Sequence, residues 1–197
     1  MMKEKVILTD CDGVLLDWSY AFDQWMTRHD YEMNPAYKHN YAMAARYGLD
    51  KKDTRRLIRM FNESATIRKL PPLRDAIKYV KKLHEEHGYV FHAITSLSND
   101  QYAQHLRTKN LIEMFGPTVF EKYVYLDCGA DKDEELIKYA DTGCWWVEDK
   151  YANAACGWGF GLKPLLMAHD HNANLETDKD IPRVDNWKDI YERVTGV

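Results

Sequence analysis

Two aspartates that directly follow a short apolar run constrain this chain more than any other feature. Residues 6–8 are apolar and partly β-branched, which predicts a buried strand that continues through Thr9. Because side chains alternate along a strand, Asp10 and Asp12 are expected to project the same way, at or just past its carboxyl end. Open parallel sheets bind ligands at that edge. Gly13 then permits a backbone turn that a side chain would oppose.

The spacing of Asp10 and Asp12 also indicates a cation. Two carboxylates this close repel each other, and burying them without compensating charge is costly. A hard cation with oxygen ligands relieves that cost, and Mg²⁺ is the usual choice. Taken alone, the pair has an alternative interpretation as two turn aspartates.

The remaining hydrophobic pattern divides the chain into a helical block and an alternating region. Residues 18–70 are expected to be all helical, with helices near 18–30, 38–47 and 51–62, and to end at Pro71 and Pro72. Strands and helices alternate only after these prolines, which predicts an α/β fold with a Rossmann-like, doubly wound parallel sheet. We therefore interpret residues 1–17 and 71–197 as the core, and 18–70 as a small helical cap inserted after the first strand.

The expected elements of the alternating region are short. Strands are predicted at 89–95, 123–126, 144–147 and 162–167; helices at 73–87, 99–114, 131–139, 150–157 and 187–194; and a polar loop at 168–185.

Polar groups follow two later strands. Thr95 and Ser96 end the second strand, where their hydroxyls could donate to a phosphoryl oxygen, although helix capping is the alternative for Ser96. Glu148 and Asp149 end the fourth strand, where they could complete a Mg²⁺ site with Asp10 or cap the next helix. 

Lys132 opens the helix before the fourth strand. A lysine there could offset charge developing on a phosphoryl group, or could simply be a solvated surface residue.

The order of these motifs resembles the haloacid dehalogenase-like (HAD) superfamily, most of whose members are phosphohydrolases. Across nearly the whole chain, the succession is similar to the cytosolic 5′(3′)-deoxyribonucleotidase (type C 5′-nucleotidase) family. The segments that carry this resemblance are DCDGVLLDW, KLPPLRDAI, HAITSLS, TKNLIEMFG, ADKDEEL, WWVEDKYANA, LLMAHDHN and RVDNWKDI.

The resemblance implies roles for the acidic residues. Asp10 would attack phosphorus and form an aspartyl-phosphate, and Asp12 would act as acid and then base. Asp10, Asp149 and the Asp12 carbonyl would hold Mg²⁺, and Glu148 would touch the ion directly or through water.

The resemblance also implies how the substrate is bound. Thr95 and Ser96 would hydrogen-bond the phosphoryl group near Gly13, with Lys132 as counter-charge. Aromatic residues of the cap could stack on a base, with core packing as the alternative; these are Trp18, Phe22, Trp25, Tyr41 and Phe61. The family places aromatics before the Leu-Pro-Pro segment, where this chain has residues 64–67, Ser-Ala-Thr-Ile, so pyrimidine preference does not carry over.

The implied function is Mg²⁺-dependent hydrolysis of a small-molecule phosphate ester, a nucleoside monophosphate with deoxy forms included. One alternative is a HAD phosphatase for sugar phosphates or polynucleotide 3′-phosphates. The others are a phospho-acceptor signalling module, which would carry its acceptor on a later strand, and a non-catalytic phosphate-binding protein.

Composition narrows the partners. A net charge of −4 gives no support for a stable nucleic-acid partner. Eight basic residues nevertheless crowd positions 51–74, as a solvated helix face or an anion-attracting surface. No apolar run reaches the ~18 residues of a membrane span, and the N-terminal run is too short for a signal peptide. The four cysteines form no Cys-x-x-Cys pair, which is typical of reduced thiols. We therefore expect a cytoplasmic protein, and the sequence leaves a homodimer open.

His169 and His171 are spaced like a weak metal pair. No third nitrogen or thiolate ligand is evident nearby, so we do not interpret them as a zinc site.

Overall fold

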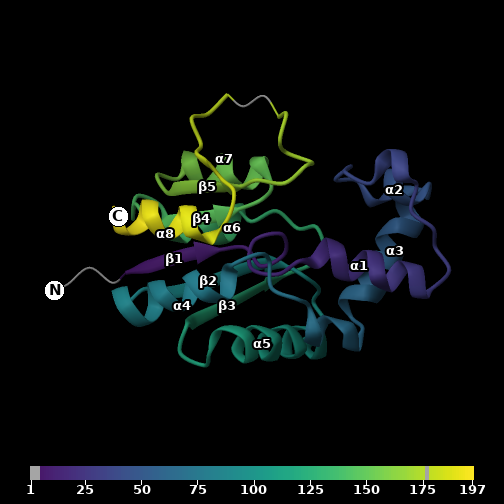
Figure 1. The fold of residues 1–197 in the computed structure, drawn as a ribbon, viewed down its shortest axis with the longest axis horizontal. Helices are drawn as coiled ribbons and strands as arrows, with labels where there is room; N and C mark the ends of the chain where they lie inside the picture. Colours follow the sequence, from purple (N-terminus) through teal and green to yellow (C-terminus); the bar gives the residue numbers. More distant parts are fainter. Residues whose placement is uncertain (1–4, 176–177) are drawn as a thin grey trace.

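The structure is a computed structural model that describes residues 5–175 and 178–197. Within these residues, six strands form one sheet in which every pairing is parallel, in the order β3-β2-β1-β4-β5-β6 (Figure 1). The strands are β1 (Val6–Thr9), β2 (Val90–Ser96), β3 (Phe120–Leu126), β4 (Trp145–Glu148), β5 (Lys163–Met167) and β6 (Arg183–Val184). The sequence prediction of a Rossmann-like parallel sheet is confirmed. Residues 1–4 of the predicted core and 176–177 of the predicted polar loop lie outside the described residues.

Helices cover both faces of the sheet, as a doubly wound fold requires. Ile7 and Leu8 are consecutive on β1 and belong to different buried clusters, because alternate strand side chains point to opposite faces. One face packs under α4 (Ala76–His87), α5 (Gln101–Phe115) and α8 (Trp187–Thr195), and the other under α6 (Asp133–Leu136), the 3₁₀ helix Ile137–Tyr139 and α7 (Tyr151–Gly159).

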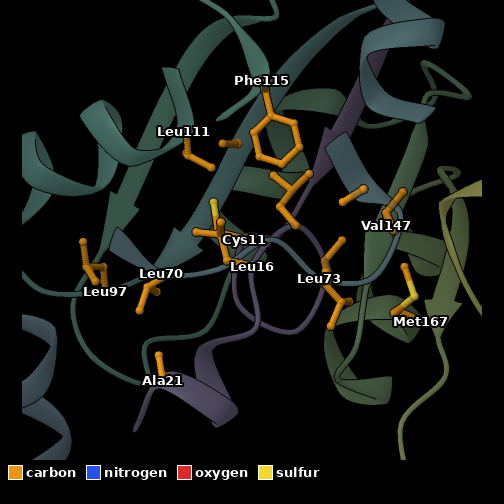
Figure 2. Close-up of a cluster of buried hydrophobic side chains, with 14 of the residues drawn as sticks. Cys11, Leu16, Ala21, Leu70, Leu73, Leu97, Leu111, Phe115, Val147 and Met167 are labelled. Carbon is orange, nitrogen blue, oxygen red and sulfur yellow. The ribbon is translucent and has the colours of Figure 1, made fainter. Parts of the chain in front are cut away.

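Segment 18–70 lies beyond the carboxyl ends of the strands (Figure 1). It contains α1 (Trp18–Arg28), the 3₁₀ helix Pro35–Tyr37, α2 (Met43–Tyr47), α3 (Lys51–Asn62) and the 3₁₀ helix Ala65–Lys69. Its aromatic side chains are continuous with the core, because Phe22 and Phe61 belong to the same buried cluster as the side chains under α4 and α5. Cys11, Leu16 and Leu70 lie in the part of this cluster that Figure 2 shows. The segment therefore shares one hydrophobic core with the sheet.

The structure corrects three local predictions. The expected helix 38–47 is reduced to α2, because the side chain of Asn40 accepts the Ala42 N–H at 2.8 Å and forms a turn that competes with a helix. β3 begins at Phe120, ahead of the predicted residue 123. β6 lies inside the predicted loop 168–185, since a strand of two residues carries no readable alternation. Within the described residues, no helix is both long and apolar enough to cross a membrane.

Candidate active site

The turn after β1 and the carboxyl ends of β2 and β4 open into one cavity of about 790 Å³. These strands are neighbours in the sheet, so three distant parts of the sequence deliver their side chains to the same edge. The predicted site residues that line the cavity are Asp10, Asp12, Gly13, Trp18, Thr95, Ser96, Lys132, Glu148 and Asp149. Segment 18–70 forms the opposite wall.

Lys132 connects the two strand ends that flank the cavity. Its ammonium lies 2.8 Å from Asp10 Oδ2 and 2.7 Å from Glu148 Oε2, and the side chain is 2% exposed. Burial acts to lower the pKa of Lys132, but attraction by Asp10 and Glu148 outweighs it, so the pKa is raised. The site therefore contains a fixed positive charge beside Asp10.

Three carboxylates, two of which contact this ammonium, lie close together. Ligand oxygens of Asp10, Glu148 and Asp149 all lie within 4.8 Å of one another. Burial raises the pKa of Asp149 well above its usual range, and repulsion by Glu148 and then Asp10 raises it further. With all three carboxylates ionised, the single ammonium leaves a net charge of −2, which a divalent cation would balance. An all-oxygen donor set fits Mg²⁺.

Gly13 makes this arrangement sterically feasible. Its φ of +74° belongs to the left-handed region, and a Cβ at this position would lie 2.8 Å from Asp149 Cγ and closer still to Oδ2. The turn after β1 can therefore approach Asp149 only without a side chain.

The two hydroxyls at the end of β2 differ in their partners. Ser96 donates to the Ala130 carbonyl at 2.8 Å, which ties β2 to the loop before Lys132. Thr95 is 1% exposed, and its Oγ1 has no hydrogen-bond partner in the part of the chain that the structure describes. A buried hydroxyl on a cavity wall that lacks a partner is suited to bind a ligand.

Asp12 contacts a residue that the sequence analysis missed. Arg107, on α5, is completely buried, and its Nη1 lies 2.7 Å from Asp12 Oδ1. Burial raises the pKa of Asp12, with Arg107 opposing the rise and Asp10 adding to it. Helical periodicity could have indicated this residue, since Arg107 falls on the buried stripe of α5, which comprises Ala103, Leu106, Arg107, Asn110, Leu111 and Phe115.

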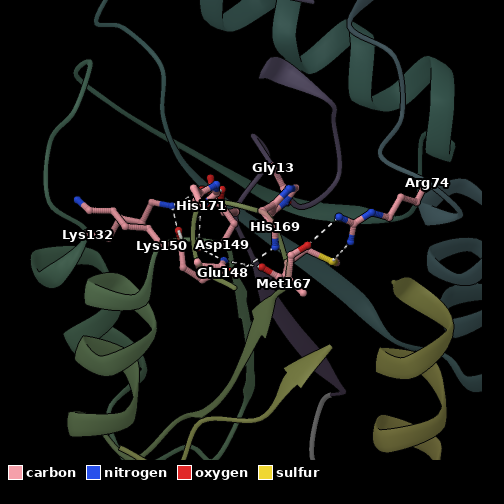
Figure 3. A network of polar contacts seen from close by, with 12 residues as sticks. Gly13, Arg74, Lys132, Glu148, Asp149, Lys150, Met167, His169 and His171 are labelled. Atoms are coloured by element: carbon pink, nitrogen blue, oxygen red, sulfur yellow. Dashed lines mark hydrogen bonds and ion pairs between the residues drawn. The ribbon is translucent and has the colours of Figure 1, made fainter. Parts of the chain in front are cut away.

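The loop after β5 supports the turn after β1 (Figure 3). His169 Nε2 donates to the Gly13 carbonyl at 2.6 Å, and Asn172 Nδ2 donates to the Asp149 carbonyl at 2.9 Å. The rings of His169 and His171 stack at 5.3 Å, and burial lowers the pKa of both. His169 and Asn172 therefore hold the backbone on either side of the acidic cluster, a role that the spacing of the two histidines in the sequence did not reveal.

Comparison with known proteins identifies a relative. The chain is 30% identical over 198 residues to an uncharacterised 32.4 kDa protein of enterobacteria phage T4, from the Gp30–rIII intergenic region. The match covers 95% of this chain and 69% of the phage protein. The chain belongs to the family of this phage protein. No protein-family model matches it.

Comparison with solved structures identifies the fold of this chain. A haloacid dehalogenase-like hydrolase from Streptococcus pneumoniae aligns with a TM-score of 0.65 at 14% identity, over 98% of this chain and 99% of that one. D,D-heptose 1,7-bisphosphate phosphatase from Burkholderia thailandensis aligns with a TM-score of 0.60 at 11% identity, over 98% and 100%. The enzyme of the same name from B. bronchiseptica, complexed with magnesium and phosphate, gives 0.56 at 12%, over 98% of each chain. This chain therefore has the HAD fold, as the sequence motifs predicted.

The aromatic residues of segment 18–70 are divided between packing and the cavity. Phe22 is 1% exposed, stacks on Trp18 at 4.7 Å and meets Phe61 edge-on at 5.3 Å, and it does not line the cavity. The Phe22 ring therefore fills the space between helices, which is the packing alternative for this residue, and its contact with substrate stays a prediction. Trp18 and Tyr41 do line the cavity, and the Tyr41 ring lies 4.9 Å from that of His171.

Proposed function

We propose that this chain is a Mg²⁺-dependent phosphomonoester hydrolase that acts through an aspartyl-phosphate on Asp10. The observation that carries the proposal is the meeting of Asp10, Asp12, Thr95, Lys132 and Asp149 on one cavity at the ligand-binding edge of a HAD-type sheet. Structural relatives that are phosphatases, one of them complexed with magnesium and phosphate, lend support.

The carboxylates of Asp10 and Asp12 have different roles in the two steps of the reaction. In the first step, an Asp10 oxygen bonds to phosphorus, the bond to the leaving-group oxygen breaks, and Asp12 gives that oxygen a proton. In the second step, Asp12 takes a proton from water, the water oxygen bonds to phosphorus, and the bond to Asp10 breaks to release phosphate. The buried setting of Asp12, which raises its pKa, favours the protonated form that the first step needs.

Asp10 and Asp149 would hold the Mg²⁺ ion together with the Asp12 carbonyl, and the bound ion would screen Asp10 from the phosphate and polarise the phosphoryl oxygens. Both Glu148 oxygens are already engaged, Oε2 with Lys132 and Oε1 with the Lys150 N–H at 3.0 Å. Glu148 therefore acts chiefly by fixing Lys132.

Thr95 and Lys132 would bind the phosphoryl group. The unpaired Thr95 hydroxyl donates to a phosphoryl oxygen, and the Lys132 ammonium offsets the charge that develops there. Ser96 and Gly13 shape the same wall, Ser96 through its bond to Ala130 and Gly13 through its close approach to Asp149.

We propose nucleoside monophosphates, deoxy forms included, as the substrates, with segment 18–70 acting as the cap that binds the nucleoside. The cavity of about 790 Å³ lies within the ~300–1,000 Å³ typical of small-molecule sites. Trp18 and Tyr41 offer flat rings on its cap side, and the Tyr41 ring lies beside His171.

Phosphate release from a panel of esters tests the proposal. The panel comprises ribo- and deoxyribonucleoside monophosphates, sugar phosphates and a 3′-phosphorylated oligonucleotide, each with Mg²⁺ or EDTA. We expect Mg²⁺-dependent turnover that is fastest on nucleotides and abolished in Asp10→Asn. Asp53→Asn makes the same chemical change on the exposed surface of α3 and should retain activity. Turnover by Asp10→Asn at the wild-type rate would exclude the nucleophile, and indifference to the base would exclude the nucleotide preference.

A further inference from the structure

Arg107 is a buried charged residue to which the proposed reaction assigns no role. Its guanidinium is fully buried, and the ion pair with Asp12 is the one that the structure records for it among the described residues. All three of its nitrogens, like Asp12 Oδ1, are buried without a hydrogen-bond partner in the same residues, so the contact with Asp12 is an ion pair without hydrogen-bond geometry. Removing a guanidinium from water is costly unless a partner compensates it. Because the rest of this helical stripe is largely apolar, packing alone would be served better by leucine or methionine.

The ion pair with Arg107 makes the two carboxylate oxygens of Asp12 unequal. Oδ1 lies against Arg107 and is buried, whereas the Asp12 side chain as a whole is 22% exposed and lines the cavity. Oδ2 is therefore the oxygen left for a ligand. A carboxylate held through one oxygen by a rigid group has far less rotational freedom than a free aspartate.

The helix that carries Arg107 is itself anchored near the site. Asp100 caps α5 by accepting the Ala103 N–H at 2.7 Å, and Asn110 Nδ2 donates to the Leu70 carbonyl at 3.2 Å. Leu70 ends segment 18–70, so α5 is fixed to the junction where the chain returns to the core. The guanidinium therefore has a defined position relative to β1.

We propose that Arg107 is a positioning residue for Asp12. By holding Oδ1 from behind, it aims Oδ2 at the leaving-group oxygen. The proton passes from Oδ2 to that oxygen as the phosphorus–oxygen bond breaks and its electron pair goes to the leaving oxygen. This inference rests on the proposed function, because it takes Asp12 as the general acid.

Leaving groups that differ in their need for a proton test the inference. Dinitrophenolate departs unprotonated, whereas the alkoxide of a nucleoside 5′-monophosphate needs the acid. We expect Arg107→Met to lower kcat/KM, which reports formation of the aspartyl-phosphate and excludes its hydrolysis, about 10- to 100-fold more on the nucleotide than on dinitrophenyl phosphate, since a positioned acid contributes ~10²–10⁴-fold. KM should change little, and Arg107→Lys should recover part of the loss. Equal loss on both esters, or faster turnover, overturns the inference.

A second arginine that contacts α5 supplies the control. Arg68 pairs with Glu113 of α5 and does not line the cavity. Arg68→Met should give no selective loss on the nucleotide relative to the dinitrophenyl ester. If Arg107→Met does not fold, Arg107→Lys carries the test, because its displaced charge should still give a loss that is larger on the nucleotide.

Asp12→Asn separates this inference from the proposed function. If Asp12→Asn loses more activity on the nucleotide than on dinitrophenyl phosphate, and neither Arg107 variant does so, the positioning role is overturned and the proposed hydrolase function stands. Absence of Mg²⁺-dependent hydrolysis of every ester by the wild-type chain overturns both. In an Asp12→Asn background, Arg107→Lys should add no further dependence on the leaving group.

Discussion

Gly13 and Asp149 fit together only because one of them has no side chain. A Cβ on Gly13 would lie 2.8 Å from Asp149 Cγ, and the backbone φ of +74° is itself unfavourable for any other residue. Pairing of β1 with β4 already places the proposed nucleophile Asp10 beside the acidic cluster, and the approach of Gly13 keeps the turn after β1 close to Asp149.

The first prediction concerns this approach. Gly13→Ala should lower stability by about 1–3 kcal/mol through backbone strain alone, and should also lower Mg²⁺-dependent turnover by displacing Asp149. Gly48→Ala is the matched control, because Gly48 has a similar φ of +62° with nothing within 4 Å of its would-be Cβ. Urea unfolding and phosphate release measure the two effects. Equal activity in both variants would show that the contact with Asp149 does not matter.

The second prediction concerns Lys132. Lys132→Met leaves Asp10 and Glu148 buried without their cation, which typically lowers stability by about 3–5 kcal/mol. We also expect kcat to fall at least about 10²-fold and the variant to bind Mg²⁺ more tightly, since a competing positive charge is gone. Lys138→Met removes an exposed lysine paired with Glu135 and should change stability little. Thermal unfolding with and without Mg²⁺ distinguishes these outcomes, and weaker Mg²⁺ binding in Lys132→Met would contradict the charge argument.

The third prediction is that Mg²⁺ stabilises the folded protein in the absence of substrate. The uncompensated charge of the acidic cluster predicts a rise in Tm with Mg²⁺ concentration, corresponding to about 2.7 kcal/mol at 100 times Kd. Asp149→Asn should abolish this rise, whereas Asp170→Asn, which alters an exposed carboxylate on the cavity rim, should retain it. A Tm that does not respond to Mg²⁺ in the wild-type chain would argue against the metal site.

The fourth prediction concerns the cysteine between the two aspartates. Burial raises the pKa of the Cys11 thiol to about 12, so at neutral pH it is protonated, and protonated thiols react poorly with alkylating agents. We expect iodoacetamide to leave Cys11 unmodified in the native protein and to modify it in urea, as measured by mass spectrometry. Labelling of native Cys11 as fast as that of the partly exposed Cys144 would mean that the turn after β1 opens readily.

The fifth prediction separates the two kinds of aromatic residue in segment 18–70. Tyr41→Ala should raise KM for nucleoside monophosphates and leave KM for dinitrophenyl phosphate nearly unchanged, because the ring lines the cavity beside His171. Phe22→Ala should instead lower stability by about 3–5 kcal/mol, as expected for a buried ring. Kinetics on both esters and thermal unfolding measure the two effects. A raised KM for nucleotides in Phe22→Ala, or an unchanged one in Tyr41→Ala, would contradict the prediction.

Local patterns in the sequence were enough to predict the sheet and the edge that carries the site. A bounded apolar run followed by Asp10 and Asp12, and later strands followed by Thr95 and by Glu148 and Asp149, predicted which side chains share one edge. This succeeds because parallel strands place all their carboxyl ends together, so sequence position alone fixes the edge.

Only the tertiary structure decided which groups face one another across that edge. Periodicity places Arg107 on the buried stripe of α5, and places Phe22 on an apolar helix face, but it does not state what lies opposite either residue. The packing of α5 beneath the turn after β1 turned Arg107 into the partner of Asp12, and the packing of α1 on α3 kept Phe22 out of the cavity. The physical reason is that strand and helix periods are local properties of the backbone, whereas an ion pair depends on how two segments distant in the sequence pack against each other.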